Sequence, residues 1–93
     1  MDPVHLKTFL SVAKHLNYTR AAEELFLSQP AVSRQIQLLA KNAGAQLFEQ
    51  IGRSLHLTDA GRTLAAEAAR LLGDIERIKE SVRGFGTAAR GRL

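Results

Sequence analysis

The stretch "LFLSQPAVSRQIQLL", residues 25–39, decides the fold because it places a turn directly before an amphipathic helix. Ser28 is a good helix cap, and Pro30 is tolerated in the first turn of a helix. Apolar residues follow at helical spacing on one side: Val32, Ile36, Leu39 and Ala43. The proline and several polar residues fall on roughly the opposite side: Pro30, Ser33, Arg34, Gln37 and Lys41. We therefore predict a helix over residues 28–43, ended by Gly44, with one face in a core and the other exposed.

Two further helices are predicted before this one. Asp2 and Pro3 form a helix start, and the apolar positions after them share one face: Leu6, Phe9, Leu10, Ala13 and Leu16. Asn17 can cap a second, short helix with four residues directed inward: Tyr18, Ala21, Ala22 and Leu25. Phe26 and Leu27 then form a tight link, which lacks the glycine that such links often carry. A bracing helix followed by two helices joined by a tight link describes a helix-turn-helix.

The segment "FEQIGRSLHL", residues 48–57, has the character of two short strands. Runs of about three residues flank a turn at Gly52, which can take a positive φ, so a small hairpin is predicted. Arg53 would project from its tip, where a basic side chain can enter the minor groove of DNA. The predicted fold class is therefore mainly α: a winged helix-turn-helix of three helices and a short two-stranded wing, followed by a long helix.

Thr58 and Asp59 open this long helix, which is predicted to run to about Gly84. The glycine-rich end "GFGTAARGRL" is expected to fray or to lead into a linker. The apolar positions of the helix alternate steps of four and three residues, which makes a heptad seam: Leu64, Ala68, Leu71, Ile75, Ile78, Val82 and Phe85. We predict a homodimer through this seam, because the three-helix core is too small to cover it. The alternative is that the helix folds back onto its own domain.

Composition excludes several classes of protein. The 93 residues contain no cysteine, which excludes a disulfide framework and a cysteine-ligated metal site. The apolar runs are too short to span a membrane, so we expect a cytoplasmic protein. The net charge of +4 permits nucleic-acid binding without demanding it. Neither the three histidines nor the serines form a catalytic or metal-binding constellation, so we expect no enzyme, no cofactor and no metal.

The exposed face of helix 28–43 is the best candidate for a function. An α-helix fits the major groove of DNA, where glutamine can pair with adenine and arginine with guanine. Hydroxyl groups and free N–H groups at the helix start suit phosphate oxygens. A dimer would present two such helices with twofold symmetry, which matches an inverted-repeat DNA site. The rival hypotheses are a protein-interaction module in which the polar face is idle, and a small enzyme, which no residue supports.

With these elements in place, the chain closely resembles the N-terminal DNA-binding domain of LysR-type transcriptional regulators over about residues 3–90. The specific parts are "AAEELFLSQPAVSRQI", the following "LF" and "LTDAGR" at the start of the long helix. The resemblance implies a bacterial regulator whose linker helix dimerises, usually antiparallel. It implies base contacts from Gln29, Pro30, Ser33 and Arg34. It implies backbone contacts from Thr19, Ser28, Gln37 and Lys41, and a wing contact in the minor groove from Arg53.

The resemblance also implies a domain organisation. Residues 1–57 would form the DNA-binding domain, residues 58–86 the linker helix, and residues 87–93 the start of a hinge. The hinge would lead to an effector domain that senses a small molecule and is absent here, so a tetramer is expected only with that missing part.

Two positions depart from the pattern of the family. Ala40 and Gln50 stand where the family commonly has Glu and Arg. The acid and the base are lost together, which suggests that they were partners and that their effects on stability would couple.

Overall fold

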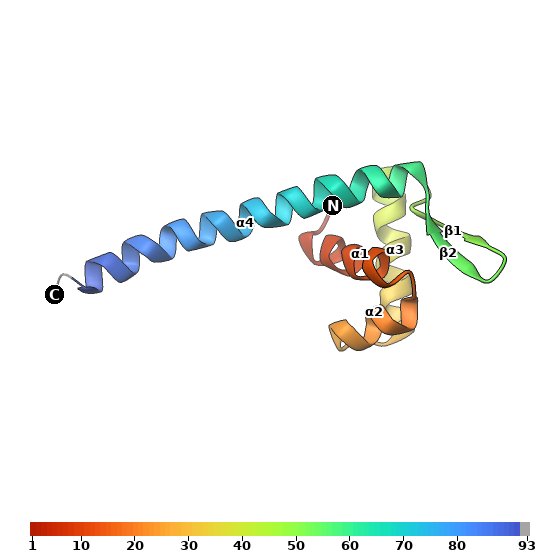
Figure 1. The fold of residues 1–93 in the computed structure, drawn as a ribbon, viewed down its shortest axis with the longest axis horizontal. Coiled ribbons are helices and arrows are strands. Elements are labelled where there is room, and N and C mark those ends of the chain that lie inside the picture. The colour runs from red at the N-terminus through yellow and green to blue at the C-terminus, as the bar shows by residue number, and fades with distance from the viewer. Residues whose placement is uncertain (92–93) are drawn as a thin grey trace.

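The computed structural model describes the backbone of residues 1–91 and the side chains of residues 1–86. Four helices and one hairpin follow one another (Figure 1): α1 Pro3–His15, α2 Tyr18–Leu25, α3 Gln29–Ala43, β1 Phe48–Ile51, β2 Ser54–Leu57 and α4 Asp59–Gly91. The wing β1–β2 projects from one end of the molecule, and α4 extends from the domain toward the other end. The predicted winged helix-turn-helix with a long helix is confirmed.

The predicted helix caps are all present, because each depends on residues only two or three positions away. The side chain of each cap accepts a backbone N–H: Asp2 from Val4, Asn17 from Arg20, Ser28 from Ala31 and Thr58 from Gly61. Gly44 ends α3 with φ 71°, the left-handed conformation that glycine adopts without strain. These local signals set where all four helices begin and where α3 ends.

The link between α2 and α3 has a left-handed residue that is not glycine. Phe26 has φ 56°, and its N–H bonds back to the carbonyl groups of Ala22 and Glu23. Its side chain is 95% exposed, so no packing compensates the strained backbone. The missing glycine of this link therefore corresponds to a strained turn in the folded protein.

The core lies between α1, α2, α3 and the base of the wing. Its largest buried side chains include Phe9, whose ring lies 5.3 Å from that of Phe48 at the start of β1. The predicted inward residues of α3 are buried, with the exception of Ala43, which is exposed because α3 there extends beyond the core. Leu16 is also more exposed than predicted, since it is the left-handed residue that ends α1.

The start of α4 belongs to this core, which corrects two predictions. Ala68 is 2% exposed, and Leu64 packs half-buried against the same cluster. They were predicted to lie in a dimer interface, but these first turns of α4 pack against their own domain. The predicted domain boundary after residue 57 therefore cuts through one packed unit.

The far end of α4 differs from the prediction too. The helix continues through Gly84 and Gly86 to Gly91, whereas it was predicted to end near Gly84. An interior glycine costs about 1 kcal/mol relative to alanine, yet it keeps its helical hydrogen bonds. Neither glycine takes the positive φ with which Gly44 ends α3. Most of the predicted hinge, residues 87–93, is thus helical backbone, and residues 92–93 lie outside the described residues.

Candidate DNA-binding interface

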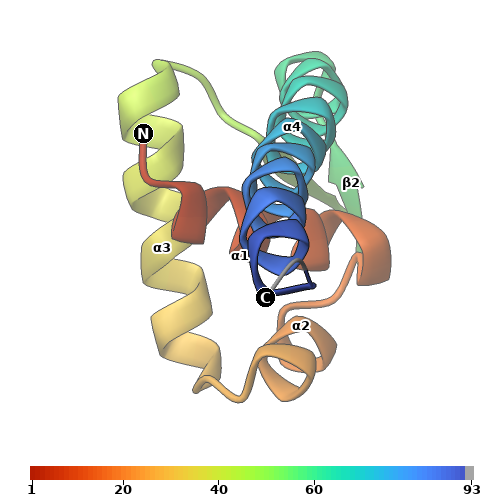
Figure 2. The same cartoon turned by 90° about the vertical axis from the view of Figure 1, so that its left-hand side faces the viewer.

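The exposed face of α3 carries the polar side chains that were predicted to read DNA. Figure 2, which looks along α4, shows α3 at the edge of the domain with its outer side open. The predicted contact residues on this helix are exposed, apart from Ser33, which is half-buried: Gln29, Pro30, Ser33, Arg34, Gln37 and Lys41. Among the described residues, neither Arg34 nor Lys41 forms an ion pair. Both cations are therefore available to an external anion or base edge.

A partly buried hydrogen bond joins α3 to α1. Thr8 is buried, and its hydroxyl donates to the side-chain oxygen of Gln35 at 2.6 Å. The sequence analysis did not single out either residue. The only signal in the sequence is that Gln35 lies one position before buried Ile36, away from the polar stripe. A short, partly buried hydrogen bond between two helices restricts the rotation of α3, and so helps to direct its exposed face.

Thr19 and Ser28 are the two other residues predicted to contact the DNA backbone. Thr19 is exposed in the first turn of α2, and Ser28 is exposed at the cap of α3. The oxygen of Ser28 accepts the Ala31 N–H at 3.2 Å, which leaves its hydroxyl hydrogen free to donate outward. The two residues flank the helix-turn-helix at the beginnings of its two helices, where hydroxyl groups suit phosphate oxygens.

Arg53 lies at the tip of the wing, as predicted. Strands β1 and β2 pair antiparallel with Ile51 opposite Ser54, so Gly52 and Arg53 form a two-residue turn. Gly52 has φ 60°, as the first central residue of a hairpin turn of type II′ requires. The exposed Arg53 is therefore carried at the end of a short, regular hairpin (Figure 1).

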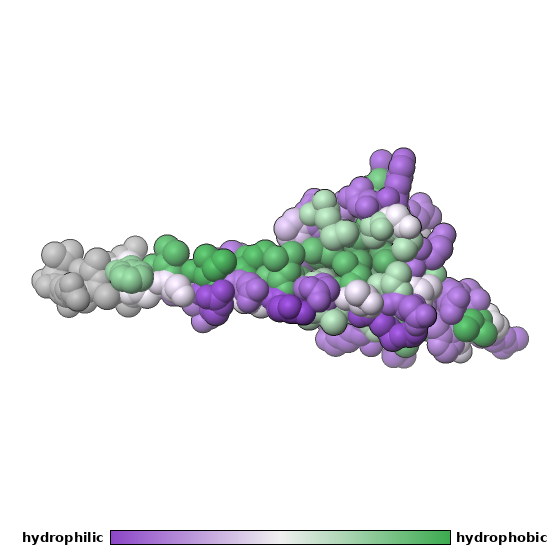
Figure 3. All heavy atoms as spheres, turned by 90° about the horizontal axis from the view of Figure 1, so that it is seen from above, coloured by the Kyte–Doolittle hydropathy of each residue, from purple (hydrophilic) through white to green (hydrophobic). Residues whose placement is uncertain are grey.

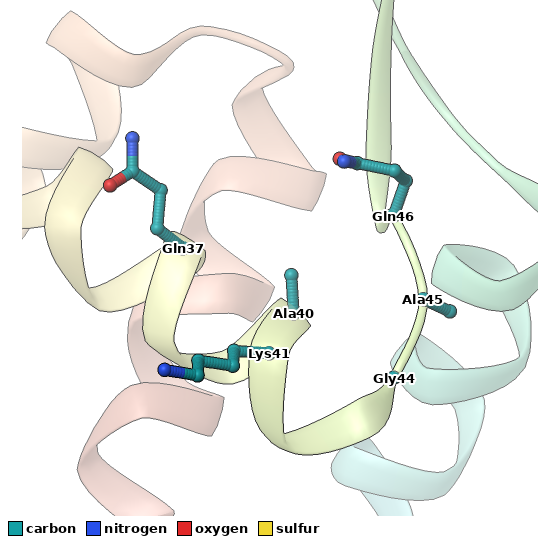
Figure 4. Close-up of a pocket in the computed structure, with 6 residues that line it drawn as sticks. All are labelled: Gln37, Ala40, Lys41, Gly44, Ala45 and Gln46. Atoms are coloured by element: carbon teal, nitrogen blue, oxygen red, sulfur yellow. The ribbon is translucent and has the colours of Figure 1, made fainter.

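A groove of about 540 Å³ continues the surface of α3 at its C-terminal half. Its lining comes from α3 and the following connection (Figure 4): Gln37, Ala40, Lys41, Gly44, Ala45 and Gln46. Gln46 faces this groove from the wing side, and its backbone oxygen accepts the Thr58 hydroxyl at 2.6 Å. Sequence reasoning missed Gln46, because it lies outside any helical face.

The electrostatic cluster at Glu24 lies away from the exposed face of α3. Hydrogen bonds from Lys14 at 2.8 Å and from Ser11 at 2.5 Å hold the pKa of Glu24 at about 2. The imidazole Nε2 of His15 lies 3.3 Å from the same carboxylate. These contacts join the C-terminal half of α1 to α2, so the cluster stabilises the packing of these two helices.

The outer half of α4 carries an apolar stripe that the domain does not cover (Figure 3). The remaining members of the predicted seam lie on it, and four of them are exposed: Leu71 46%, Ile78 53%, Val82 66% and Phe85 81%. Ile75, between Leu71 and Ile78, is half-buried. An apolar stripe of this length on an extended helix is typical of an oligomerisation surface.

Sequence comparison identifies the family of the chain. The profile of "Bacterial regulatory helix-turn-helix protein, lysR family" matches residues 3–62, which cover the three helices, the wing and the start of α4. The chain belongs to the lysR family. Among curated relatives it is 44% identical over 91 residues to a RuBisCO operon transcriptional regulator of Allochromatium vinosum. It is 40% identical over 93 residues to a probable cat1 operon transcriptional activator of Acinetobacter lwoffii.

Solved structures of the lysR family share this fold. A CbnR DNA-binding domain in complex with DNA has a TM-score of 0.85 at 36% identity, covering 90% of this chain and 97% of that one. A BenM DNA-binding domain in complex with catB site 1 DNA has a TM-score of 0.88 at 31% identity, covering 92% and 97%. The matches cover 95% and 100% of this chain but only 29% and 31% of the length of the two curated relatives.

Ala40 and Gln50, the two departures from the lysR-family pattern, lie in different hollows. Ala40 lines the groove beside α3, whereas Gln50 lines a cleft between the wing and α2. Their predicted coupling stays a prediction. Within the described residues, no three His, Cys, Asp or Glu side chains group in a way that could hold a metal. No described helix is long and apolar enough to cross a membrane.

Proposed function

We propose that this lysR-family chain binds double-stranded DNA sequence-specifically and serves as the DNA-binding part of a dimeric transcriptional regulator. The observation that supports this most is the open face of α3. On it, two cations without an ion pair to any described residue and three further polar side chains lie beside a wing tipped by Arg53. The relatives are named as transcriptional regulators, so we assign no enzymatic activity. Such a regulator acts on the chromosome, which in bacteria is in the cytoplasm.

Each exposed residue has a distinct role in this proposal. The residues at the start of α3 contact base edges in the major groove: Gln29, Pro30, Ser33 and Arg34. Phosphates are contacted by residues from α2, the α3 cap and the later turns of α3: Thr19, Ser28, Gln37 and Lys41. Arg53 enters the neighbouring minor groove. The division follows from chemistry, since bidentate side chains distinguish bases and hydroxyl or amine groups suit phosphates.

The dimer forms through the outer half of α4. The outer seam is nearly symmetric about Ile78, with Ile75 and Val82 at three and four residues from it and Leu71 and Phe85 at seven. An antiparallel pair centred on Ile78 therefore places Leu71 against Phe85 of the second chain and Ile75 against Val82. This arrangement puts the two α3 helices at opposite ends with twofold symmetry, as an inverted-repeat site requires. A tetramer requires a further domain.

Titration of selected DNA tests the proposal. Duplexes are first selected by the chain from a random pool, and fluorescence anisotropy then compares the selected inverted repeat with a scrambled duplex over a salt series. We expect tighter binding to the repeat, by a factor of about 10³ or more, and a steep fall of affinity with salt. Equal and weak binding to both duplexes would favour a protein-interaction module instead.

A further inference from the structure

A cleft of about 200 Å³ separates the wing from the start of α2. Six residues line it: Leu16, Asn17, Tyr18, Gln50, Arg53 and Leu55. Side chains alternate along a strand, so Gln50 lies on the same face of β1 as Phe48, one step nearer the tip. Phe48 packs with its ring 6.1 Å from that of Tyr18. This face of the wing is therefore held against the beginning of α2, and the cleft is a fixed part of the fold.

The polar side chains of the cleft are hydrogen-bond donors. The Asn17 side-chain oxygen accepts the Arg20 N–H at 2.9 Å, which leaves its amide nitrogen to donate. The amide nitrogen of Gln50 reaches the Gly52 oxygen at 3.4 Å, the long end of the hydrogen-bond range, and is easily exchanged. The Tyr18 phenol is protonated at neutral pH, because the ordinary pKa of tyrosine is near 10 and burial raises it further. Three neutral donors thus line one small space.

The charge of the cleft is positive. Arg53 is exposed at its edge and forms no ion pair with any described residue. No carboxylate of the described residues lines the cleft, since Glu49 lies on the opposite face of β1. A cation beside several neutral donors, without a competing acid, is chemistry suited to a phosphate group.

We propose that this cleft binds one phosphate of the DNA backbone, held by the Tyr18 hydroxyl and the Gln50 amide, with Arg53 supplying the charge. The inference rests on the proposed DNA-binding function. A sugar–phosphate strand separates the major groove from the minor groove. A domain with α3 in one groove and Arg53 in the other must lie against that strand between them. The cleft is bounded by Arg53 on one side and by the turn that carries Thr19 on the other.

Three substitutions separate this contact from general electrostatics. Tyr18→Phe removes only the hydroxyl and should weaken binding to selected and scrambled duplexes alike, by roughly 3- to 10-fold. Gln50→Arg should strengthen binding and steepen the slope of log affinity against log salt by about one. Glu49→Gln is the matched control, since it adds the same charge to the opposite face of the same strand. Equal gains from Gln50→Arg and Glu49→Gln would overturn the proposal.

A second experiment tests which DNA phosphate the cleft contacts. Selected duplexes are made with one backbone phosphate at a time replaced by an uncharged methylphosphonate. For the wild-type chain we expect one position per half-site, between the two grooves, at which this replacement weakens binding. The double variant Tyr18→Phe, Gln50→Ala should lose this sensitivity while it keeps its sequence preference. If the wild type discriminates between duplexes but the double variant keeps every sensitive position, the cleft proposal fails alone. If the wild type shows no preference for the selected duplex, the proposed function fails with it.

Discussion

Gly61 is the position at which the fold leaves least room for a side chain. A Cβ added there would lie 2.1 Å from the backbone oxygen of Leu47 and 2.9 Å from a methyl carbon of Leu57. The same Leu47 oxygen accepts the Thr58 N–H at 3.1 Å, so it cannot move without breaking the join between wing and helix. The glycine of "LTDAGR" is thus a packing requirement, which sequence reasoning did not recognise.

Gly61→Ala should therefore destabilise the domain by about 1–3 kcal/mol or more, because a methyl group would be forced against backbone. The free energy of unfolding in urea measures this. Gly73→Ala is the control: open space surrounds Gly73, so alanine should stabilise the helix by up to about 1 kcal/mol. A Gly61→Ala protein as stable as wild type would show that α4 can shift away from the wing.

Phe26 offers the opposite case, in which glycine should improve stability. A left-handed residue with a Cβ costs about 1–2 kcal/mol of stability, which glycine would avoid. Glycine loses more chain entropy on folding, however, which offsets about 0.5–1 kcal/mol of this gain. The exposed ring makes few contacts to lose. We expect Phe26→Gly to gain about 0.5–1 kcal/mol in thermal or urea unfolding. Phe26→Ala keeps the Cβ and should show no such gain. Equal gains from Phe26→Gly and Phe26→Ala would mean that the aromatic ring, not the left-handed backbone, is the source of the strain.

Glu24 should make stability fall in acid. Its hydrogen bonds from Lys14 and Ser11 lower its pKa from 4.5 to about 2, so the folded state favours the charged carboxylate. This contribution is complete above the unfolded pKa of about 4.5 and is lost as the pH falls from there toward 2. Glu24→Gln should flatten the fall in urea midpoint between pH 6 and pH 3. The exposed neighbour Glu23, changed to Gln, should leave the fall unchanged, and parallel curves for all three proteins would contradict the assignment.

At the scale of the element, the proposed function gives the two ends of α3 different roles: base contacts near its start and phosphate contacts further along. Arg34 lies early in the helix, and Lys41 lies about two turns later. If the proposed roles hold, Arg34→Ala should cost about 1–3 kcal/mol and relax sequence preference, because a base-edge contact is lost. Lys41→Ala should weaken all duplexes alike. Anisotropy with selected and scrambled duplexes measures both, and a reversed pair of outcomes would place the base contacts elsewhere.

The elements could be predicted where their signals are local. Caps such as Asn17 and Ser28 depend on groups within three residues, and the Gly52 turn fixes the wing hairpin in the same way. Position on one helix face could be predicted for most of α3, though not for Ala43, because periodicity does not say where the core ends. Leu64 and Ala68 continue the seam of α4 without a break, so only tertiary packing separates the residues that fill the domain from those left outside it.

The candidate site could be predicted only in part for a similar reason. Exposed residues of one helix, such as Arg34, follow from helical periodicity, and Arg53 follows from the hairpin. Gln46 and Tyr18 could not be recognised, because each gains its place from segments distant in the chain. The groove beside α3 and the cleft beside the wing exist only after the hairpin has packed against α2 and α4.

At the scale of the whole molecule, we expect the apolar stripe on α4 to determine the oligomeric state. Ile75→Glu combined with Ile78→Glu puts charges at the centre of the proposed antiparallel pair, where burial of an unpaired charge is strongly unfavourable. We expect a monomer by sedimentation velocity with the helical content of the domain retained. Lys79→Glu with Glu76→Lys, a change of the exposed charged side of the same turns, is the control and should stay dimeric. A dimer that survives the paired isoleucine change would require a different interface.

Because α4 is one continuous helix, its length sets how far apart the two α3 helices of the proposed dimer lie along DNA. Each residue adds about 1.5 Å along a helix and turns the seam by about 100°. An insertion between the domain and Ile78 therefore keeps the two stripes facing each other only in steps of about seven residues. In a symmetric pair, one such step would move the two reading helices apart by roughly 21 Å, about six base-pair steps along DNA. The separation of half-sites that such a dimer can span thus changes in discrete jumps, not residue by residue.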